Sequence, residues 1–364
     1  MLAFETPSAD RVTATASHAA GRVRPFEPDD VPAVADLYMR AYRRVDRSAS
    51  PELRRYVMEA FLTDPWRRLD VSPSLVHEGR DGRTTAFLGA HPRRFIVAGR
   101  EITASAMGQM MVDPNARRSG IARRLGQAMI AGPQALTFGT TASAEAAMLW
   151  RSLGFWNPAA SGMTWRRTLE RPPRFPSRRW FAERLAAGDR RFGSATLAVR
   201  AMIGAEEWCG LTRLFADDRH VSPNLDDDHA RWIWSLLGQS RQKGRAQGWV
   251  VERRGFGTIG WWVGLLDDAG RFRVLDTAVT PNHVVDAVAA LIAHGEHGGW
   301  TRIEGVCTSP ALTAAVVACG ARLHAGPGAH VYFAADPAVR AAVHNAGALI
   351  SELHSESWLS FAER

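Results

Sequence analysis

The spacing of hydrophobic residues changes several times along the chain, and each change marks a predicted element. Leu37, Tyr38 and Ala41 recur at helical spacing, which predicts a helix over residues 29–44. From Ser74 onward the apolar positions alternate or run continuously, as they do in β-strands. The predicted order of the first half is strand, two helices, three strands, helix, strand, helix, strand.

Turn and cap residues divide these elements. Asp81-Gly82 and Gly99-Arg100 predict hairpin turns. Pro114 ends a strand at 101–112, because proline cannot donate a hydrogen bond within a sheet. The other predicted elements are a strand at 23–28, helices at 51–62, 119–130 and 143–153, and a strand at 135–140.

The second half repeats this plan at two points. Val112-Asp-Pro-Asn115 matches Val279-Thr-Pro-Asn282, and each tetrapeptide lies between a predicted strand and a helix. Gly154 and Gly320 end later helices, at separations of 42 and 41 residues (154 − 112 and 320 − 279). Predicted helices follow at 205–218, 228–239, 283–293 and 310–318, and predicted strands at 247–254, 257–266, 271–279, 301–307 and 329–334.

The pattern predicts two α/β domains of the α+β kind, each with a central mixed, mostly antiparallel sheet flanked by helices. The predicted segments are a flexible lead at 1–22, a first domain at 23–168, a Pro- and Arg-rich linker at 169–200 with a short helix, and a second domain with a C-terminal tail at 201–364. Within that tail, 349–361 predicts a last strand or a docking tail. Glu352, His354 and Glu356 would share one strand face, which we expect to be solvated unless it meets a cationic acceptor.

Composition narrows the classes of function. The formal net charge is +8, but arginine is spread along the whole chain, so we expect no nucleic-acid partner. No apolar run approaches about 18 residues and the N-terminus has no signal pattern, so we expect no membrane partner and a cytoplasmic location. Cys209, Cys307 and Cys319 have neither disulfide nor metal-ligand spacing, which predicts core residues and no metal site.

The most informative segment is 110–122, MMVDPNARRSGIA, where a predicted strand leads through a short loop into a helix. The first N–H groups of a helix have no partner within the helix, and the helix dipole adds partial positive charge at that end. Gly120 allows a ligand close to the main chain, and Arg117, Arg118 and Arg123 add formal charge. The segment therefore predicts a pyrophosphate site. It matches neither a P-loop nor a dinucleotide fingerprint.

Arg117-x-x-Gly120-x-Ala122 resembles the Arg/Gln-x-x-Gly-x-Gly/Ala signature of the GNAT N-acetyltransferase superfamily. The Val-x-Pro that usually precedes this signature is present at Val112-Asp-Pro114, and the usual Gly-Phe pair at Gly154-Phe155. The resemblance covers residues 23–168. It implies a GNAT-like fold in each half, with a degenerate second half, and acetyl-CoA or another acyl-CoA as the cofactor.

The resemblance also implies which residues bind this cofactor. In the family, the main-chain amides of the loop bind the pyrophosphate, and pantetheine lies where the preceding strand diverges from its neighbour. The cofactor-binding residues implied in this way are Met111, Val112, Arg117, Arg118, Ser119, Gly120, Ile121, Ala122, Arg123 and Ser143.

The catalytic residues of the family are not matched. Trp150 stands where many members have a tyrosine that protonates the departing thiolate, and the strand before the loop has no carboxylate in place of the usual glutamate base. Either proximity and a backbone amide suffice, or the acid and base come from elsewhere in the fold. The general acid and base are therefore unknown. Candidates are Ser143, Gln109 and Tyr38, and also His77, Glu78, His91 and Tyr42.

The second half has the family's outline without its loop. After Val279-Thr-Pro-Asn282 it has no arginine and no glycine, and Asp286 would repel a pyrophosphate. We therefore expect that this half does not bind CoA and instead shapes the acceptor site or covers the first half.

The sequence thus predicts an acyl-CoA-dependent N-acyltransferase that moves an acetyl group to a primary amine by direct attack. Two alternatives stay open. One is a non-catalytic acyl-CoA-binding or scaffold protein on the same fold. The other is a tRNA-dependent aminoacyl transferase, which also pairs two GNAT-like halves. The expected partner is a small molecule or another acceptor that bears an amine. Its identity, and whether the chain forms a homodimer, stay open.

Overall fold

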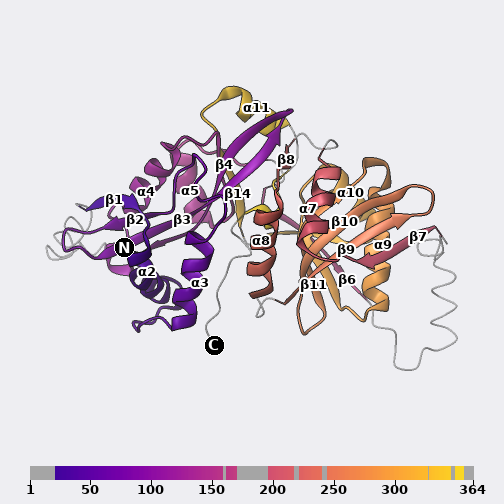
Figure 1. Cartoon of the computed structure of the whole chain (residues 1–364), viewed down its shortest axis with the longest axis horizontal. Coiled ribbons are helices and arrows are strands. Elements are labelled where there is room, and N and C mark those ends of the chain that lie inside the picture. The colour runs from indigo at the N-terminus through magenta and orange to yellow at the C-terminus, as the bar shows by residue number, and fades with distance from the viewer. Residues whose placement is uncertain are drawn as a thin grey trace, which may run out of the picture.

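The computed structural model describes residues 21–158, 161–169, 196–216, 221–239, 244–326, 328–345 and 349–355. Two bodies lie side by side, each built on its own sheet (Figure 1). Within the described residues each sheet has seven strands, with one parallel pair among antiparallel neighbours. The predicted fold class is confirmed. The predicted helix in the linker lies outside the described residues, as does nearly all of the predicted N-terminal lead.

The first half contains the elements in the order that the hydrophobic pattern predicts. They are β1 (Arg22–Pro25), the 3-10 turn η1 (Pro28–Asp30), α2 (Val31–Tyr38), the π-helical turn η2 (Met39–Arg43), α3 (Pro51–Leu62), β2 (Leu75–Glu78), β3 (Thr84–Val97), β4 (Arg100–Val112), η3 (Pro114–Ala116), α4 (Ile121–Ile130), β5 (Leu136–Ala142), α5 (Ala144–Ser152) and β6 (Met163–Thr168).

Helices cover both faces of the first sheet. The apolar face of α4, formed by Ile121, Leu125 and Met129, is buried together with α5 against one face. On the other face, α2 and α3 pack over β2, β3 and β4 in a separate hydrophobic cluster. This layering leaves the N-terminus of α4 at the end of β4, where the predicted loop lies.

The second half contains every predicted strand and helix and four elements that the sequence pattern missed, namely β7, β8, β13 and α11. The elements are β7 (Leu197–Ala201), α7 (Ala205–Leu214), β8 (Val221–Pro223), α8 (Asp227–Gln239), β9 (Arg245–Arg253), β10 (Gly257–Leu266), β11 (Arg271–Val279), η4 (Pro281–His283), α9 (Val284–His297), β12 (Arg302–Val306), α10 (Pro310–Ala318), β13 (Arg322–Ala325), β14 (Ala329–Phe333), α11 (Pro337–Asn345) and η5 (Glu352–His354).

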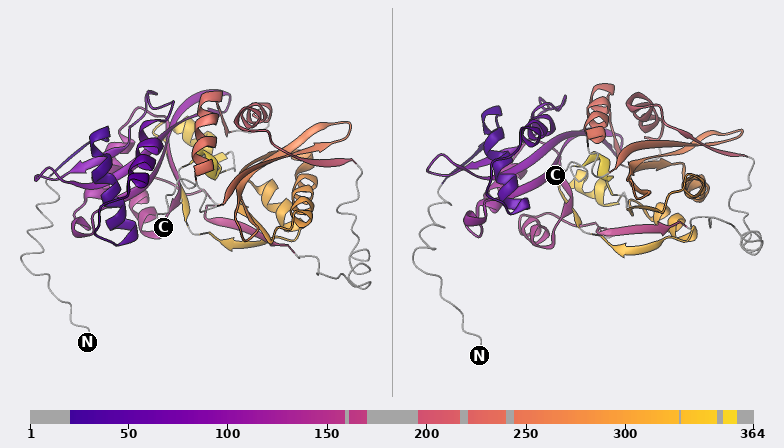
Figure 2. Two further views of the ribbon diagram at one scale, coloured as in Figure 1. Left: turned by 60° about the horizontal axis from the view of Figure 1, so that its bottom comes forward. Right: turned by 90° about the horizontal axis from the view of Figure 1, so that it is seen from below.

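Among the described residues, three strands pair with the sheet of the opposite half, namely β6, β8 and β14. The first sheet has the order β1-β2-β3-β4-β5-β14, with β8 beside β3, and the second has the order β13-β6-β12-β11-β10-β9-β7. In Figure 2, β6 lies in the body of the second half. The sequence order places β6 last in the first half, but its hydrogen bonds are made to β12 and β13. The predicted domain boundaries stay a prediction.

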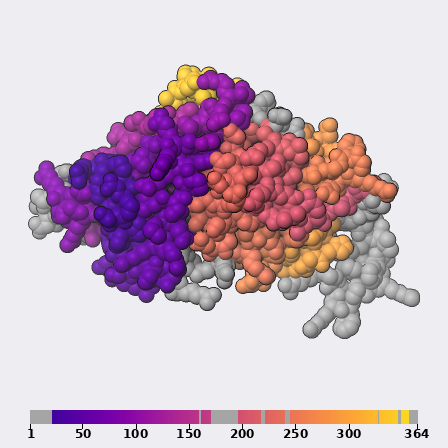
Figure 3. Space-filling model, viewed as in Figure 1, coloured from indigo at the N-terminus to yellow at the C-terminus, as the bar shows by residue number. Residues whose placement is uncertain are grey.

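The exchanged strands form a ribbon between the two sheets. Trp156 and Tyr332 exchange backbone hydrogen bonds of 2.9 and 3.0 Å, and farther along the same two segments β6 pairs with β13. The halves are in contact across the face shown in Figure 3. Because each sheet includes strands from both halves, the packing of each sheet depends on segments from both halves of the chain.

Two other predictions concern the surroundings of particular residues. Cys209, Cys307 and Cys319 are buried and free, as predicted. Glu352 and His354 were expected to be solvated, and that is wrong, because both are buried beside β11, while Glu356 lies outside the described residues. Among the described residues no helix is long and apolar enough to span a membrane, and no cluster of three or more His, Cys, Asp or Glu could hold a metal ion.

Candidate functional site

The loop between β4 and α4 has the geometry that an anion site needs. Gly120 is the N-cap of α4 with φ = 84°, a left-handed conformation that glycine adopts without strain. No side chain caps the helix, so its first-turn amides are left for another acceptor. A Cβ added at Gly120 would meet no atom within 4 Å, which means that the space beside this backbone is open.

Local hydrogen bonds hold the loop in place. Asp113 accepts a hydrogen bond from the Asn115 amide (3.0 Å), and its carboxylate pairs with Arg40 of η2 (2.9 Å). Ser119 donates to the Ala116 carbonyl (2.6 Å). The side chains of Asp113 and Ser119 are therefore engaged in shaping the turn, and the ligand-facing groups are the amides and the arginines.

Strands β4 and β5 diverge next to this loop. They pair in parallel only from Ala104↔Leu136 to Ala106↔Phe138, although β4 continues to Val112. The other edge of β4 stays paired with β3 but contains a register shift, where Gln109 has φ = 49°. A bulge of this kind turns the strand away from its neighbour. The backbone of β4 beyond Ala106 is thus free of β5.

A groove of about 760 Å³ runs from the loop into the opening between these strands. This volume is within the range of small-molecule sites. Of the predicted cofactor residues, those that line it are Val112, Arg117, Arg118, Gly120, Ile121, Ala122, Arg123 and Ser143. Gln109 also lines the groove. The sequence therefore located one wall, which consists of β4, the loop and the start of α4.

Three predicted residues do not line the groove. Met111 is buried under α2 and α3, and Ser119 bonds to the loop as described. Tyr38 also lies in the core between α2 and α3. Its neighbour Tyr42 does line the groove, and its hydroxyl donates to the Met110 carbonyl (3.3 Å). Among the tyrosine candidates the structure favours Tyr42.

The remaining candidates have structural partners. Ser143 caps α5 by accepting a hydrogen bond from the Ala146 amide (3.2 Å). His77 bonds to Thr85 (2.7 Å), and Glu78 pairs with Arg24 (2.7 Å). His91 is buried and stacks on Phe61, and its burial holds the pKa of the imidazole well below its usual value.

Apart from Ser143, the opposite wall of the groove comes from residues that the sequence reasoning missed. Gly139 and Thr141 of β5 and Val331 of β14 line it. Val331 is more than two hundred residues from the loop (331 − 122 = 209), so no local spacing could have indicated it. Trp150, which stands at the family's tyrosine position, also lines the groove and is 4% exposed.

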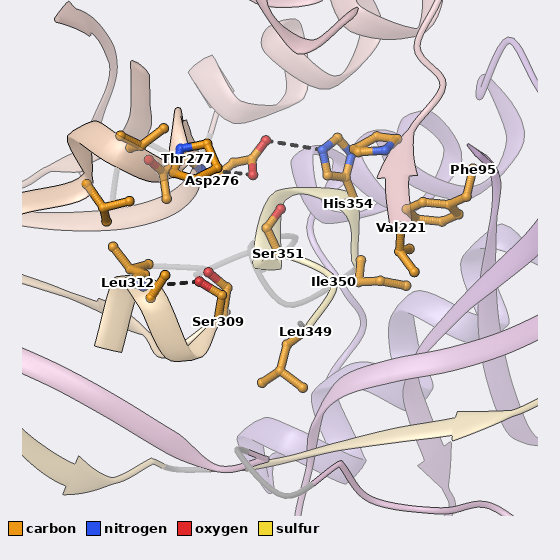
Figure 4. A pocket seen from close by; sticks show the side chains of 16 residues that line it. Phe95, Val221, Asp276, Thr277, Ser309, Leu312, Leu349, Ile350, Ser351 and His354 are labelled. Atoms are coloured by element: carbon orange, nitrogen blue, oxygen red, sulfur yellow. Dashed lines mark hydrogen bonds and ion pairs between the residues drawn. The ribbon is translucent and has the colours of Figure 1, made fainter. Parts of the chain in front are cut away.

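The second half contains a counterpart of this groove at matching positions. Val279 ends β11, Val284 begins α9, and Ser309 caps α10 by accepting from the Leu312 amide (3.1 Å), as Ser143 does in the first half. These residues line a hollow of about 260 Å³ (Figure 4). The connection from strand to helix is shorter in the second half. Helix α9 begins five residues after β11 ends, whereas α4 begins nine residues after β4 ends (284 − 279 and 121 − 112).

Residues 349–355 occupy the second opening. The Leu349 amide donates to the Thr308 carbonyl (2.7 Å), which continues the line of β12. Glu352 pairs with Arg273 (2.6 Å), and the His354 ring donates to Asp276 (3.1 Å), both on β11. Figure 4 shows His354 pointing at Asp276 across the hollow. The space between β11 and β12 is thus largely filled by the chain itself.

Residues 22–141 match the family model for the acetyltransferase (GNAT) domain. The first half contains a GNAT domain. The element order, the Gly120 turn and the divergence of β4 from β5 all lie within or next to the matched residues.

Three solved structures share the fold over most of the chain. A GCN5-related N-acetyltransferase from Anabaena variabilis ATCC 29413 has a TM-score of 0.60 and 11% identity, covering 86% of this chain and 73% of that one. One from Kribbella flavida has a TM-score of 0.55 and 15% identity, covering 87% and 72%. A probable N-acyltransferase of unknown function from Enterococcus faecalis V583 has a TM-score of 0.57 and 12% identity, covering 86% and 72%. No curated protein sequence matches.

Proposed function

We propose that the chain is an acyl-CoA-dependent N-acyltransferase that moves an acetyl group from acetyl-CoA to a primary amine by direct attack. The observation that carries this proposal is the groove that starts at the uncapped N-terminus of α4 and continues between β4 and β5. The GNAT domain in the same residues supports it.

The residues present fit such a cofactor. The amides of residues 117–122 would bind its pyrophosphate, with Arg117 and Arg118 supplying positive charge at the rim. The backbone of β4 beyond Ala106 would hydrogen-bond the pantetheine amides in place of β5. When bound, the cofactor supplies an activated thioester carbonyl, and Ser143 and Thr141 would face it from the opposite wall.

Calorimetric titration with acetyl-CoA tests the proposal. We expect micromolar binding by the native chain and at least a 100-fold loss in Gly120→Glu, because a carboxylate there would repel the pyrophosphate and a side chain would strain the left-handed turn. Gly255→Glu is the matched control. Gly255 also has φ = 84° and open space around it, but it lies in the turn between β9 and β10.

Transfer is then measured as thiol release with small amines. No binding at millimolar acetyl-CoA would reject the proposal. Binding without transfer to any amine would leave a non-catalytic acyl-CoA-binding protein instead.

A further inference from the structure

A second cavity lies next to the proposed cofactor groove, in the seam between the two sheets. It has a volume of about 470 Å³ and is lined by β5, β6, β12 and the β13–β14 connection. Thr141 lines both this cavity and the groove. Thr141 at the end of β5, beyond the last residue that pairs with β4, is therefore common to the walls of both hollows.

Strand β14 contributes one residue to each hollow. It pairs antiparallel with β5 through Ala329↔Ala142 and Val331↔Gly139. Val331 lines the cofactor groove, and its neighbour His330 lines the cavity. Adjacent residues of a strand point to opposite faces, so His330 lies on the side of the sheet from which an acceptor would approach.

The backbone of His330 is fixed on both sides. Its amide donates to Ser161 (2.7 Å), and its carbonyl accepts hydrogen bonds from Asn157 (2.7 Å) and Ser161 (3.0 Å). The ring Nδ1 lies 3.5 Å from the Tyr332 hydroxyl, which is held by the Ile350 amide (3.0 Å). In the tautomer that carries its proton on Nδ1, facing Tyr332, the ring has a lone pair on Nε2.

Burial keeps this imidazole unprotonated. The side chain is 1% exposed, and burial lowers the pKa of His330 to about 4. At neutral pH the ring is therefore uncharged, and one of its two nitrogens carries a lone pair.

Two ion pairs lie on the wall of the cavity. Its charged residues are Arg166 and Glu304, paired at 3.3 Å, and Arg273 and Glu352, paired at 2.6 Å. With both signs of charge present, this lining suits an amine that carries further hydrogen-bonding groups, and it disfavours a purely hydrocarbon amine.

We propose that this cavity binds the acceptor, a small polar amine, and that His330 accepts the proton the amine loses. The inference rests on the proposed function. The amine nitrogen forms a bond to the thioester carbonyl carbon, and the carbon–sulfur bond breaks. The amine proton moves to Nε2 of His330 and passes through solvent to the departing thiolate, so that the products are an amide and a free thiol.

The first experiment compares His330→Ala and His330→Gln with the native chain in acetyl-CoA turnover with glycinamide, glucosamine, lysine and spermidine. Loss of a general base lowers kcat by about 100-fold or more. We expect that loss in both variants, unchanged affinity for acetyl-CoA by calorimetry, and partial recovery of His330→Ala by added imidazole. His324→Ala is the control, because His324 is an exposed residue of β13. If His330→Ala does not fold, His330→Gln decides.

Ala325→Trp tests the cavity independently. Ala325 is exposed and lines the cavity, so a large side chain fills it without disturbing a core. We expect a raised KM for the amine and unchanged acetyl-CoA affinity. Transfer by His330→Gln within threefold of native, or an unchanged KM in Ala325→Trp, would overturn the inference. If the native chain binds acetyl-CoA but transfers to no amine, the proposed function itself fails, and this inference fails with it.

Discussion

The openings between β4 and β5 and between β11 and β12 are built from the same parts but are used differently. Each lies beside a parallel strand pair that separates, and each ends at a serine that caps the next helix. The first has the longer loop with Gly120 and remains a groove of about 760 Å³. The second lacks that loop and holds residues 349–355. A shared scaffold therefore does not by itself make a binding site.

The charges at the start of α4 and at the start of α9 also favour an anion in the first opening and not in the second. At α4, Arg117 and Arg118 line the groove. At α9, the nearby cation Arg253 is paired with Asp286 at 3.1 Å and bonds to His283. The acidic residue that the sequence marked as repulsive thus also neutralises the nearest arginine, and both effects work against an anion there.

The largest expected effect comes from separating the two halves. We expect that residues 1–169 and 196–364, expressed alone, do not fold cooperatively, because β14 completes one sheet and β6 the other. Co-expression is expected to recover a complex that binds acetyl-CoA. Circular dichroism measures the folding of each half, and calorimetry measures the binding of acetyl-CoA. A first half that folds and binds acetyl-CoA alone would show that its groove needs nothing from the second half.

The next prediction exchanges the loops. Deleting residues 117–120 gives the first half the short connection of the second, and we expect at least a 100-fold loss of acetyl-CoA affinity. The converse variant inserts Arg-Arg-Ser-Gly between His283 and Val284. We expect no second site, because the adjoining opening is filled by 349–355. Calorimetry gives the stoichiometry, and two equivalents bound by the insertion variant would contradict this.

A smaller effect concerns the segment that fills the second opening. Arg273→Met leaves the Glu352 carboxylate, whose side chain is 6% exposed, without its cation. Because Arg273 itself is 33% exposed, we expect a loss of about 2 kcal/mol in the free energy of unfolding, less than for a fully buried pair. Arg271→Met, which breaks an exposed pair on the same strand, should cost about 0.5 kcal/mol. Equal losses in denaturant titrations would argue against a structural role for the Glu352 pair.

The smallest effect concerns the seam between the two regions, where His91 stacks on Phe61 near Trp232. Neither ring nitrogen of His91 has a hydrogen-bond partner among the described residues. Its pKa is depressed in the folded state, so its contribution to stability is present above the unfolded value of about 6.5 and is lost as the pH falls. His91→Phe should therefore weaken the loss of stability between pH 7 and 5, measured as the free energy of unfolding by denaturant titration at each pH.

Other buried titratable groups also contribute to the pH dependence of stability. The pKa values of His229 and His330 are also lowered by burial, so they destabilise the fold in acid in the same way. Burial raises the pKa of Asp64 to about 6. This carboxyl changes stability with pH in the opposite direction, since its contribution to stability is lost as the pH rises through that value. His324→Phe, at an exposed site, is the control. Parallel curves for His91→Phe and the native chain would exclude His91 as a source of the acid sensitivity.

The sequence by itself determined the local elements and one wall of the candidate site. Helical and strand spacing predicted nearly all helices and strands, and the Val112–Ala122 segment predicted the turn at Gly120, because caps, turns and amphipathic faces are set by neighbouring residues. The same local reasoning also recognised that the second half lacks the loop.

Only the tertiary structure decided how those elements combine. The exchange of β6 and β14, the filling of the second opening by residues 349–355, and the placing of Thr141 near Val331 and His330 depend on contacts between residues far apart in the sequence. The separation is 79 positions for Arg273 and Glu352 and 187 for the paired Ala142 and Ala329 (329 − 142). Strand pairing partners are chosen by the burial of whole sheets, and a strand's own sequence specifies which face is apolar but not which neighbour it joins.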